Sequence, residues 1–172
     1  GGVKMNNEIL KKLHMTEIGI LQEVVRVCEK NQLTYYLIGG TLLGAIRHKG
    51  FIPWDDDLDI AMPREDFDKF LDISKYELRE GYWVHFIDSD PNYWLPFAKV
   101  KKRGTIFDEV NSKNIESDKG IFIDIFPLDN ARGEKSIFQS IQAIICKRMS
   151  TIILWKRGFY KHKPKIMLSI VL

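Results

Sequence analysis

A Gly-Gly pair between a strand pattern and a helix pattern constrains the fold of this chain more than any other feature. The strand pattern, Leu33 to Ile38, is rich in aromatic and β-branched residues, and the helix pattern runs from Thr41 to His48. Gly39 and Gly40 are therefore expected at a turn where backbone N–H groups and the positive helix end approach a phosphate, with Thr41 in the same site. Alone, such a pair is more often only a backbone turn, so its interpretation depends on the residues that follow.

Two aspartates alternate with apolar residues in the next strand pattern, Asp57 to Met62. Because successive side chains of a strand point to opposite faces, Asp57 and Asp59 share one face and the apolar residues between them share the other. Carboxylates about 7 Å apart repel each other unless a cation lies between them, and Mg²⁺ prefers oxygen ligands. The pattern predicts a Mg²⁺ site, with Mn²⁺ as an alternative ion.

A third acid interrupts the apolar strand pattern Ile121 to Phe126, which Pro127 is expected to end. Asp124 is expensive to bury in such a segment, so it needs a partner, a metal ion or a raised pKa that suits a base. The alternative is an acid that only caps the turn before Pro127. Because the pair Asp57 and Asp59 precedes it, we favour a site of three acids.

Basic and aromatic residues near these acids are candidates for binding a phosphate-bearing ligand. Arg47 is the first choice for a phosphate contact, whereas His48 and Lys49 are equally or better explained as a solvated helix end. Trp54 either walls the pocket and stacks on a base or head group, or anchors the core. Lys99 either contacts a phosphate or lies on an exposed strand face.

The rest of the pattern predicts an α+β fold of strands and helices in a single domain over residues 1–172. Helices are expected at Asn6–Asn31, Arg64–Ser74 and Lys135–Trp155, strands at Trp83–Ile87, Trp94–Lys101 and Thr105–Val110, and a loop at Asn111–Lys119.

Composition limits the class of protein. With 172 residues, 45% hydrophobic and 28% charged, the chain has enough apolar surface for a core, and no apolar run reaches the length of a membrane span. Cys28 and Cys146 are expected as two buried reduced thiols of a cytoplasmic protein. Gly1 to Lys4 are expected to precede a native start at Met5, and the apolar last residues suggest the front part of a longer protein.

The formal net charge of +3 conceals a basic segment without any acid, Cys146 to Leu172. For this segment we rank core packing first, contact with a membrane surface second and nucleic acid a distant third. A peripheral location at the inner face of the cell membrane is the corresponding expectation, with no nucleic-acid partner.

The segments Tyr36 to His48, Pro53 to Ile60 and Gly120 to Asp129 together resemble the LicD family, which is similar to the nucleotidyltransferase superfamily. The resemblance implies a nucleotidyltransferase-like mixed sheet flanked by helices, with a Gly-Gly turn, an Asp-x-Asp strand and a third acid on a neighbouring strand.

Residue by residue, Gly39 and Gly40 match the turn, Asp57 and Asp59 match the metal pair, and Asp124 matches the third carboxylate. The roles of the neighbouring Asp55 and Asp56 stay open. The family implies transfer of a phosphoalcohol, such as phosphocholine, from a CDP-alcohol donor to a sugar of a surface glycan or glycolipid, for example teichoic acid, lipopolysaccharide or capsule; animal relatives of the fukutin group use CDP-ribitol. The alternatives are a nucleotidyltransferase that releases pyrophosphate and a noncatalytic scaffold module of a glycan assembly complex.

Overall fold

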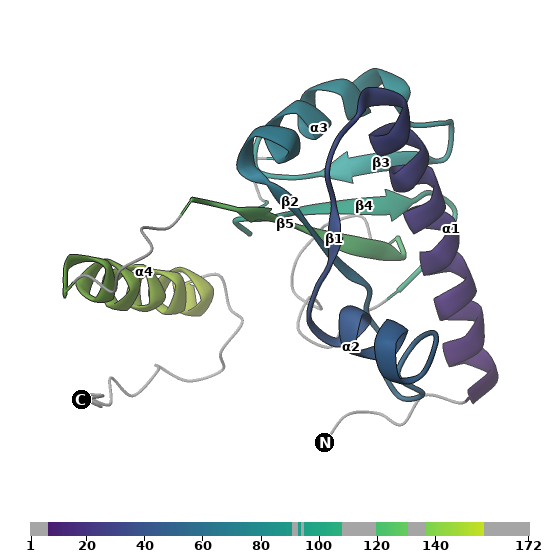
Figure 1. Ribbon diagram of the computed structural model, residues 1–172, viewed down its shortest axis with the longest axis horizontal. Helices are drawn as coiled ribbons and strands as arrows, with labels where there is room; N and C mark the ends of the chain where they lie inside the picture. The colour runs from purple at the N-terminus through teal and green to yellow at the C-terminus, as the bar shows by residue number, and fades with distance from the viewer. Residues whose placement is uncertain (1–6, 91–92, 94, 108–119, 131–136, 157–172) are drawn as a thin grey trace. The chain divides into compact units, whose positions relative to one another are not determined.

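The computed structural model of the chain describes residues 7–90, 93, 95–107, 120–130 and 137–156 (Figure 1). Within these residues four helices and a five-stranded mixed sheet form, which confirms the predicted α+β class. The elements are α1 (Asn7–Asn31), β1 (Tyr36–Leu37), α2 (Gly39–Arg47), β2 (Asp59–Pro63), α3 (Arg64–Glu77), β3 (Tyr82–His85), β4 (Ala98–Lys102), β5 (Phe122–Leu128) and α4 (Ile137–Lys156).

The sheet has the strand order β1-β2-β5-β4-β3. β2 and β5 pair in parallel, whereas β1 with β2, β4 with β5 and β3 with β4 pair antiparallel. Parallel neighbours require a long crossover connection, and here the chain between them contains α3, β3 and β4. Two segments that lie far apart in sequence, β2 and β5, therefore become neighbours in the sheet.

One face of the sheet carries the hydrophobic core. Ile60, Val100 and Ile125 have no exposed surface, and they belong to one cluster with apolar residues of α1 and α3. Figure 1 shows both helices beside the sheet, with α1 in contact with β4 and β5 and α3 in contact with β2, β3 and β5. Because side chains alternate along each strand, residues next to these in sequence point to the opposite face.

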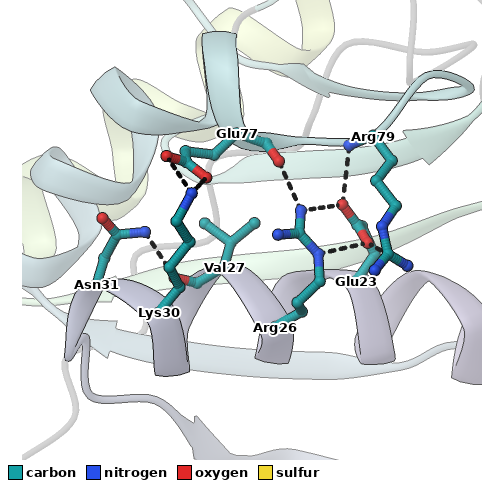
Figure 2. Close-up of polar contacts among 7 residues, drawn as sticks. All are labelled: Glu23, Arg26, Val27, Lys30, Asn31, Glu77 and Arg79. Carbon is teal, nitrogen blue, oxygen red and sulfur yellow. Dashed lines mark hydrogen bonds and ion pairs between the residues drawn. The ribbon is translucent and has the colours of Figure 1, made fainter.

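α1 follows the predicted helix closely, and its apolar positions recur at three and four residues as expected for a helix with one buried face. Two glutamates interrupt this buried face, Glu17 at 2% and Glu23 at 3% exposed. Glu23 is fully partnered: its carboxylate accepts hydrogen bonds from Arg26 Nε at 3.0 Å and Nη2 at 2.6 Å and from the Arg79 backbone N–H at 2.9 Å (Figure 2). Arg26 Nη2 also donates to the Glu77 carbonyl at 2.6 Å, so the cluster ties α1 to the end of α3.

Glu23→Gln is expected to lower the free energy of unfolding by about 2 kcal/mol, because it removes the charge from a buried and fully hydrogen-bonded group. The hydrogen bond from Arg26 holds the pKa of Glu23 below its ordinary value of 4.5. The stabilisation is therefore present above that pH and is lost as the pH falls through the lower folded-state pKa. Urea unfolding of both forms at pH 7 and at pH 3 checks this: the difference should shrink at pH 3. The control Asp72→Asn removes only an exposed ion pair with Lys75 and should have little effect.

The predicted strand over Thr105–Val110 is wrong for residues 105–107, which are not in a strand, while residues 108–110 lie outside the described residues. The reason is the side chain of Thr105. Its hydroxyl donates to the Lys102 carbonyl at 2.6 Å and accepts the Ile121 backbone N–H at 2.9 Å, so it closes the turn after β4. The predicted loop at 111–119 also lies outside the described residues.

Two strand boundaries and the burial of one cysteine also differ from the prediction. The strand expected over Leu33–Ile38 forms only at Tyr36–Leu37. β5 continues through Pro127 to Leu128, because its pairing with β4 ends at Ile125 and Pro127 pairs only with β2, where Met62 is its register partner. Cys28 is buried as expected, but Cys146 in α4 is exposed, so the expectation of two buried thiols is wrong for Cys146.

The chain divides into two compact units, Gly1–Phe107 with Ser117–Asn130 and Asp108–Glu116 with Ala131–Leu172. The described part of the second unit is the 20-residue α4, in which Ile141, Ile144, Ile145 and Ile152 are each 46–57% exposed. Among the helices of the described residues, none has the length and hydropathy that would let it cross a membrane.

Candidate active site

The parallel pairing of β2 and β5 places two of the predicted site residues directly side by side. Asp59 and Asp124 are register partners, and the Asp124 backbone N–H donates to the Leu58 carbonyl at 3.0 Å. Register partners in neighbouring strands point to the same face, which here is the face opposite the apolar core. The juxtaposition of Asp124 with the Asp59 strand, expected from the sequence, is therefore present.

Asp57 does not share the strand with Asp59, because β2 begins only at Asp59. The prediction of one regular strand from Asp57 is wrong at its start. The buried side chain of Leu58 anchors the chain between the two acids, and Asp55, Asp56 and Asp57 form a loop that leads into β2. We call residues 55–57 the acid loop.

Both glycines of the predicted turn lie against carboxylates. Gly39 and Gly40 are the first two residues of α2, and Gly39 has a φ of +54°. A Cβ atom on Gly40 would come within 2.6 Å of Asp55 Oδ2, and one on Gly39 would lie 3.6 Å from Asp59 Oδ2. A side chain at Gly40 would displace the Asp55 carboxylate from its present position, so glycine allows this close approach. Asp55, whose role the sequence left open, thus lies at the positive end of α2.

Thr41 positions β2 in this structure. Its Oγ1 accepts the Asp59 backbone N–H at 2.8 Å, which fixes the first residue of β2 against the start of α2. The predicted contact of Thr41 with a donor phosphate stays a prediction, since the hydroxyl proton remains available for donation.

Lys99 is neither an exposed strand residue nor an isolated cation. It is the register partner of Asp124 in the antiparallel β4–β5 pair, and its Nζ lies 2.9 Å from Asp124 Oδ1. Only 7% of Lys99 is exposed, and its ammonium lies 3.3 Å from the centre of the Phe122 ring. The expectation of an exposed strand face is therefore wrong, because Phe122 and Asp124 cover the charge.

Arg47, His48 and Trp54 are exposed, and the structure does not bring Arg47 to the glycines. Arg47 ends the nine-residue α2, so it lies about 12 Å along the helix axis from Gly39. His48 and Trp54 make an edge contact with ring centres 6.4 Å apart. Trp54 is 77% exposed, so it does not anchor the core. The predicted contacts of these three residues with a donor stay predictions.

The site concentrates negative charge. Burial, followed by repulsion from Asp59, Asp55, Asp56 and Asp124, raises the pKa of Asp57 to about 6. Burial and Asp55 raise the pKa of Asp59, and the opposite charge of Lys99 lowers it again. Such mutual repulsion is relieved when a hard cation with oxygen ligands enters, so the chemistry of these donors fits Mg²⁺ or Mn²⁺. Within the described residues, no three acidic, histidine or cysteine side chains already stand in the arrangement of a metal site.

A further acid, Glu17, was missed by the sequence reasoning. It is 2% exposed, and its Oε2 has no hydrogen-bond partner in the described part of the structure. Burial, and then repulsion from Asp57, Asp56, Asp55 and Asp124, raises its pKa to about 8. A signal was present in the sequence, because Glu17 lies four residues from Leu13 and three from Ile20 on the apolar face of the first helix.

Without divalent cations, the free energy of unfolding is expected to fall as the pH rises from about 4.5 to about 8. The ordinary pKa of glutamate is 4.5, and Glu17 in the folded state has a pKa of about 8. Between these values the folded state binds the proton that the unfolded chain releases, so rising pH favours unfolding. Thermal unfolding in EDTA across this range measures the slope. Glu17→Gln should flatten it, and an unchanged slope in the variant would contradict the assignment of the raised pKa to Glu17.

Comparison with known proteins relates the chain that carries this site to a protein family. A family model for the LicD/FKTN/FKRP nucleotidyltransferase domain matches residues 32–152, which include both glycines and the aspartates of the site but not Glu17. The chain is similar to the lipopolysaccharide cholinephosphotransferase LicD of Haemophilus influenzae, with 36% identity over 134 residues, 74% of this chain and 49% of that protein.

Two further relatives match shorter segments of this chain. The chain is 47% identical over 67 residues to an uncharacterised protein of Rickettsia prowazekii, covering 39% of this chain and 25% of that protein. It is 51% identical over 43 residues to the ribitol 5-phosphate transferase FKRP of Homo sapiens, covering 25% of this chain and 9% of that protein. The chain thus spans about half the length of the Haemophilus influenzae relative and less of the others.

Proposed function

Because this chain belongs to the LicD/FKTN/FKRP nucleotidyltransferase-domain family, we propose that the protein transfers a phosphoalcohol, such as phosphocholine, from a CDP-activated donor to a sugar hydroxyl. The acceptor is a cell-surface glycan or glycolipid. Support comes from the names of two relatives, which describe a cholinephosphotransferase of lipopolysaccharide and a ribitol 5-phosphate transferase. The observation that carries the proposal is the pairing of Asp59 with Asp124 beside Gly39 and Gly40, inside the matched region.

Asp57, Asp59 and Asp124 are the residues that would hold a Mg²⁺ or Mn²⁺ ion. When bound, the ion neutralises charge on the two phosphates of the donor. Asp59 is held for this role from two sides, by the hydroxyl of Thr41 and by its pairing with β5. Lys99 holds the carboxylate of Asp124 in place through their 2.9 Å ion pair.

In the proposed reaction, the acceptor hydroxyl attacks the phosphorus that bears the alcohol. A new P–O bond forms to the sugar, the P–O bond to CMP breaks in line, and CMP leaves with the electron pair. Asp124 either accepts the proton of the attacking hydroxyl or completes the set of ligands for the ion. The protein supplies mainly position and charge, which is typical of phosphoryl transfer.

Product analysis of the full-length protein tests this function. With CDP-choline or CDP-ribitol, an acceptor glycan and Mg²⁺, we expect one CMP for each phosphoalcohol attached. Release of pyrophosphate from a nucleoside triphosphate would instead indicate a nucleotidyltransferase. If neither product forms and no nucleotide binds in the presence of Mg²⁺, the noncatalytic scaffold module is the better explanation.

A location in the cytoplasm, peripheral at the inner face of the membrane, is part of this proposal. It is supported by the basic residues of the C-terminal segment, of which Lys147 and Arg148 lie within α4. Basic segments bind anionic lipid surfaces in a salt-dependent way. Sedimentation of the full-length protein with anionic vesicles should fall as the salt concentration rises, and binding that is equal for neutral vesicles would contradict it.

A further inference from the structure

Two buried glutamates of α1 have opposite surroundings. Glu23 accepts hydrogen bonds from Arg26 and from the Arg79 backbone, and its pKa is lowered (Figure 2). Glu17 is buried to the same degree, yet its Oε2 has no hydrogen-bond partner among the described residues. A buried carboxylate oxygen without a partner destabilises a folded protein. Glu23 therefore has a structural explanation, and Glu17 has none within the described part of the molecule.

The contacts of α1 place Glu17 beside the acid loop. His14 lies one turn before Glu17, and residues three apart on a helix share a face. The ring of His14 stacks on Phe51 with centres 3.9 Å apart, and its Nε2 is 2.7 Å from the Asp55 backbone carbonyl oxygen. This end of α1 is therefore attached to the segment that leads into the acid loop, and the next buried position along the same face is Glu17.

The charges that raise the pKa of Glu17 are those of four aspartates. Asp57 acts most strongly, followed by Asp56, Asp55 and Asp124. Glu17 thus adds a carboxyl group from the helix layer to a site that already carries several carboxylates.

We propose that Glu17 is a further acidic residue of the active site, which accepts a hydrogen bond from a water molecule on the bound divalent cation and so strengthens cation binding. The proposal rests on the cation site of the proposed function. Glu17 acts through the cation's water and the acid loop, so it is a positioning residue. An incoming cation supplies both a hydrogen-bond donor for Glu17, through its bound water, and positive charge that offsets the repulsion among the carboxylates.

Cation-dependent thermal unfolding of the full-length protein, with Mg²⁺ or Mn²⁺ alone, tests this proposal. For Glu17→Gln we expect an unfolding temperature without cation that is no lower than that of the wild type, because no existing contact is lost. The cation concentration that gives half of the stabilisation should rise about 10-fold or more. Glu17→Asp keeps the carboxyl group on a shorter side chain. Its half-saturating cation concentration should lie between those of the wild type and Glu17→Gln.

Glu23→Gln is the matched control, since it makes the same chemical change at an equally buried position of the same helix. It should lower the unfolding temperature without cation and leave the half-saturating concentration unchanged. In the transfer assay, Glu17→Gln should raise the Mg²⁺ requirement far more than it changes kcat at saturating Mg²⁺.

Each other result overturns the proposal. A normal cation response in Glu17→Gln would show that Glu17 does not contribute, while leaving the proposed function intact. A loss of stability without cation like that of Glu23→Gln, or failure of both Glu17 variants to fold, would show a structural role. If the wild type itself gains no stability from either cation, the cation site and this proposal are both contradicted.

Discussion

Asp59→Asn is expected to reduce kcat for phosphoalcohol transfer by about 10²- to 10³-fold or more. Asp59 is the residue at which three features of the site meet: the pairing with Asp124, the hydrogen bond to Thr41 and the approach to Gly39. Two of these features involve the Asp59 backbone, so the substitution leaves them in place. What it removes is one charge of the proposed cation site.

The same substitution should not destabilise the protein without cation. Burial and the charge of Asp55 raise the pKa of Asp59, so its ionised form is unfavourable in the folded state. Asparagine has nearly the same shape and no charge, and the unfolding temperature in EDTA is expected to stay the same or rise. Steady-state kinetics and thermal unfolding of the same preparation separate the two effects. Asp88→Asn, at an exposed loop position after β3, is the control for the loss of one acid. Full activity in Asp59→Asn would exclude this carboxylate from the mechanism.

Gly44→Ala is expected to lower the free energy of unfolding by about 1–3 kcal/mol. A Cβ atom at Gly44 would lie 2.6 Å from the Gly50 carbonyl oxygen and 3.0 Å from the Ile52 backbone nitrogen. Both contacts are with backbone, so no side-chain rotation relieves them, and the loop after α2 has to move. That loop continues into the acid loop, so transfer activity should fall as well.

Gly19→Ala is the matched control for this substitution. Gly19 lies inside α1, and a Cβ atom there meets nothing within 4 Å. Alanine is favoured over glycine inside a helix by about 0.5–1 kcal/mol, so this variant should be more stable than the wild type. Urea unfolding of both variants measures whether the free energy of unfolding falls in Gly44→Ala and rises in Gly19→Ala. Equal stability of Gly44→Ala and wild type would mean that the close packing of α2 against residues 50–52 is absent in solution.

The periodicity of apolar residues was sufficient to predict the longer helices and strands. The apolar spacing of α1 and α3 and the alternation around Ile60 and Ile125 reflect local geometry, since a helix repeats every 3.6 residues and a strand every two. The family and the α+β class followed from local segments, and the family model and the fold confirm both. Short elements were less predictable, because side chains such as that of Thr105 replace strand pairing with a hydrogen bond of their own.

The surroundings of the site residues depend on contacts between distant segments, which no local pattern contains. Lys99 was expected either to contact a phosphate or to lie on an exposed strand face, but β4 pairs with β5 and brings it to Asp124. Glu17 was not identified from the sequence, because only the packing of α1 on the acid loop gives its carboxyl acidic neighbours.

Local sequence patterns identified the acids and glycines of the site and the short strand or helix that carries most of them. The tertiary structure alone decided which of them lie together: parallel pairing joined Asp59 to Asp124, and helix packing added Glu17. The physical reason is the distance along the chain over which each effect acts. Backbone periodicity is set by neighbours within a few residues, whereas the pKa of a carboxyl group depends on burial and on charges brought close by the fold.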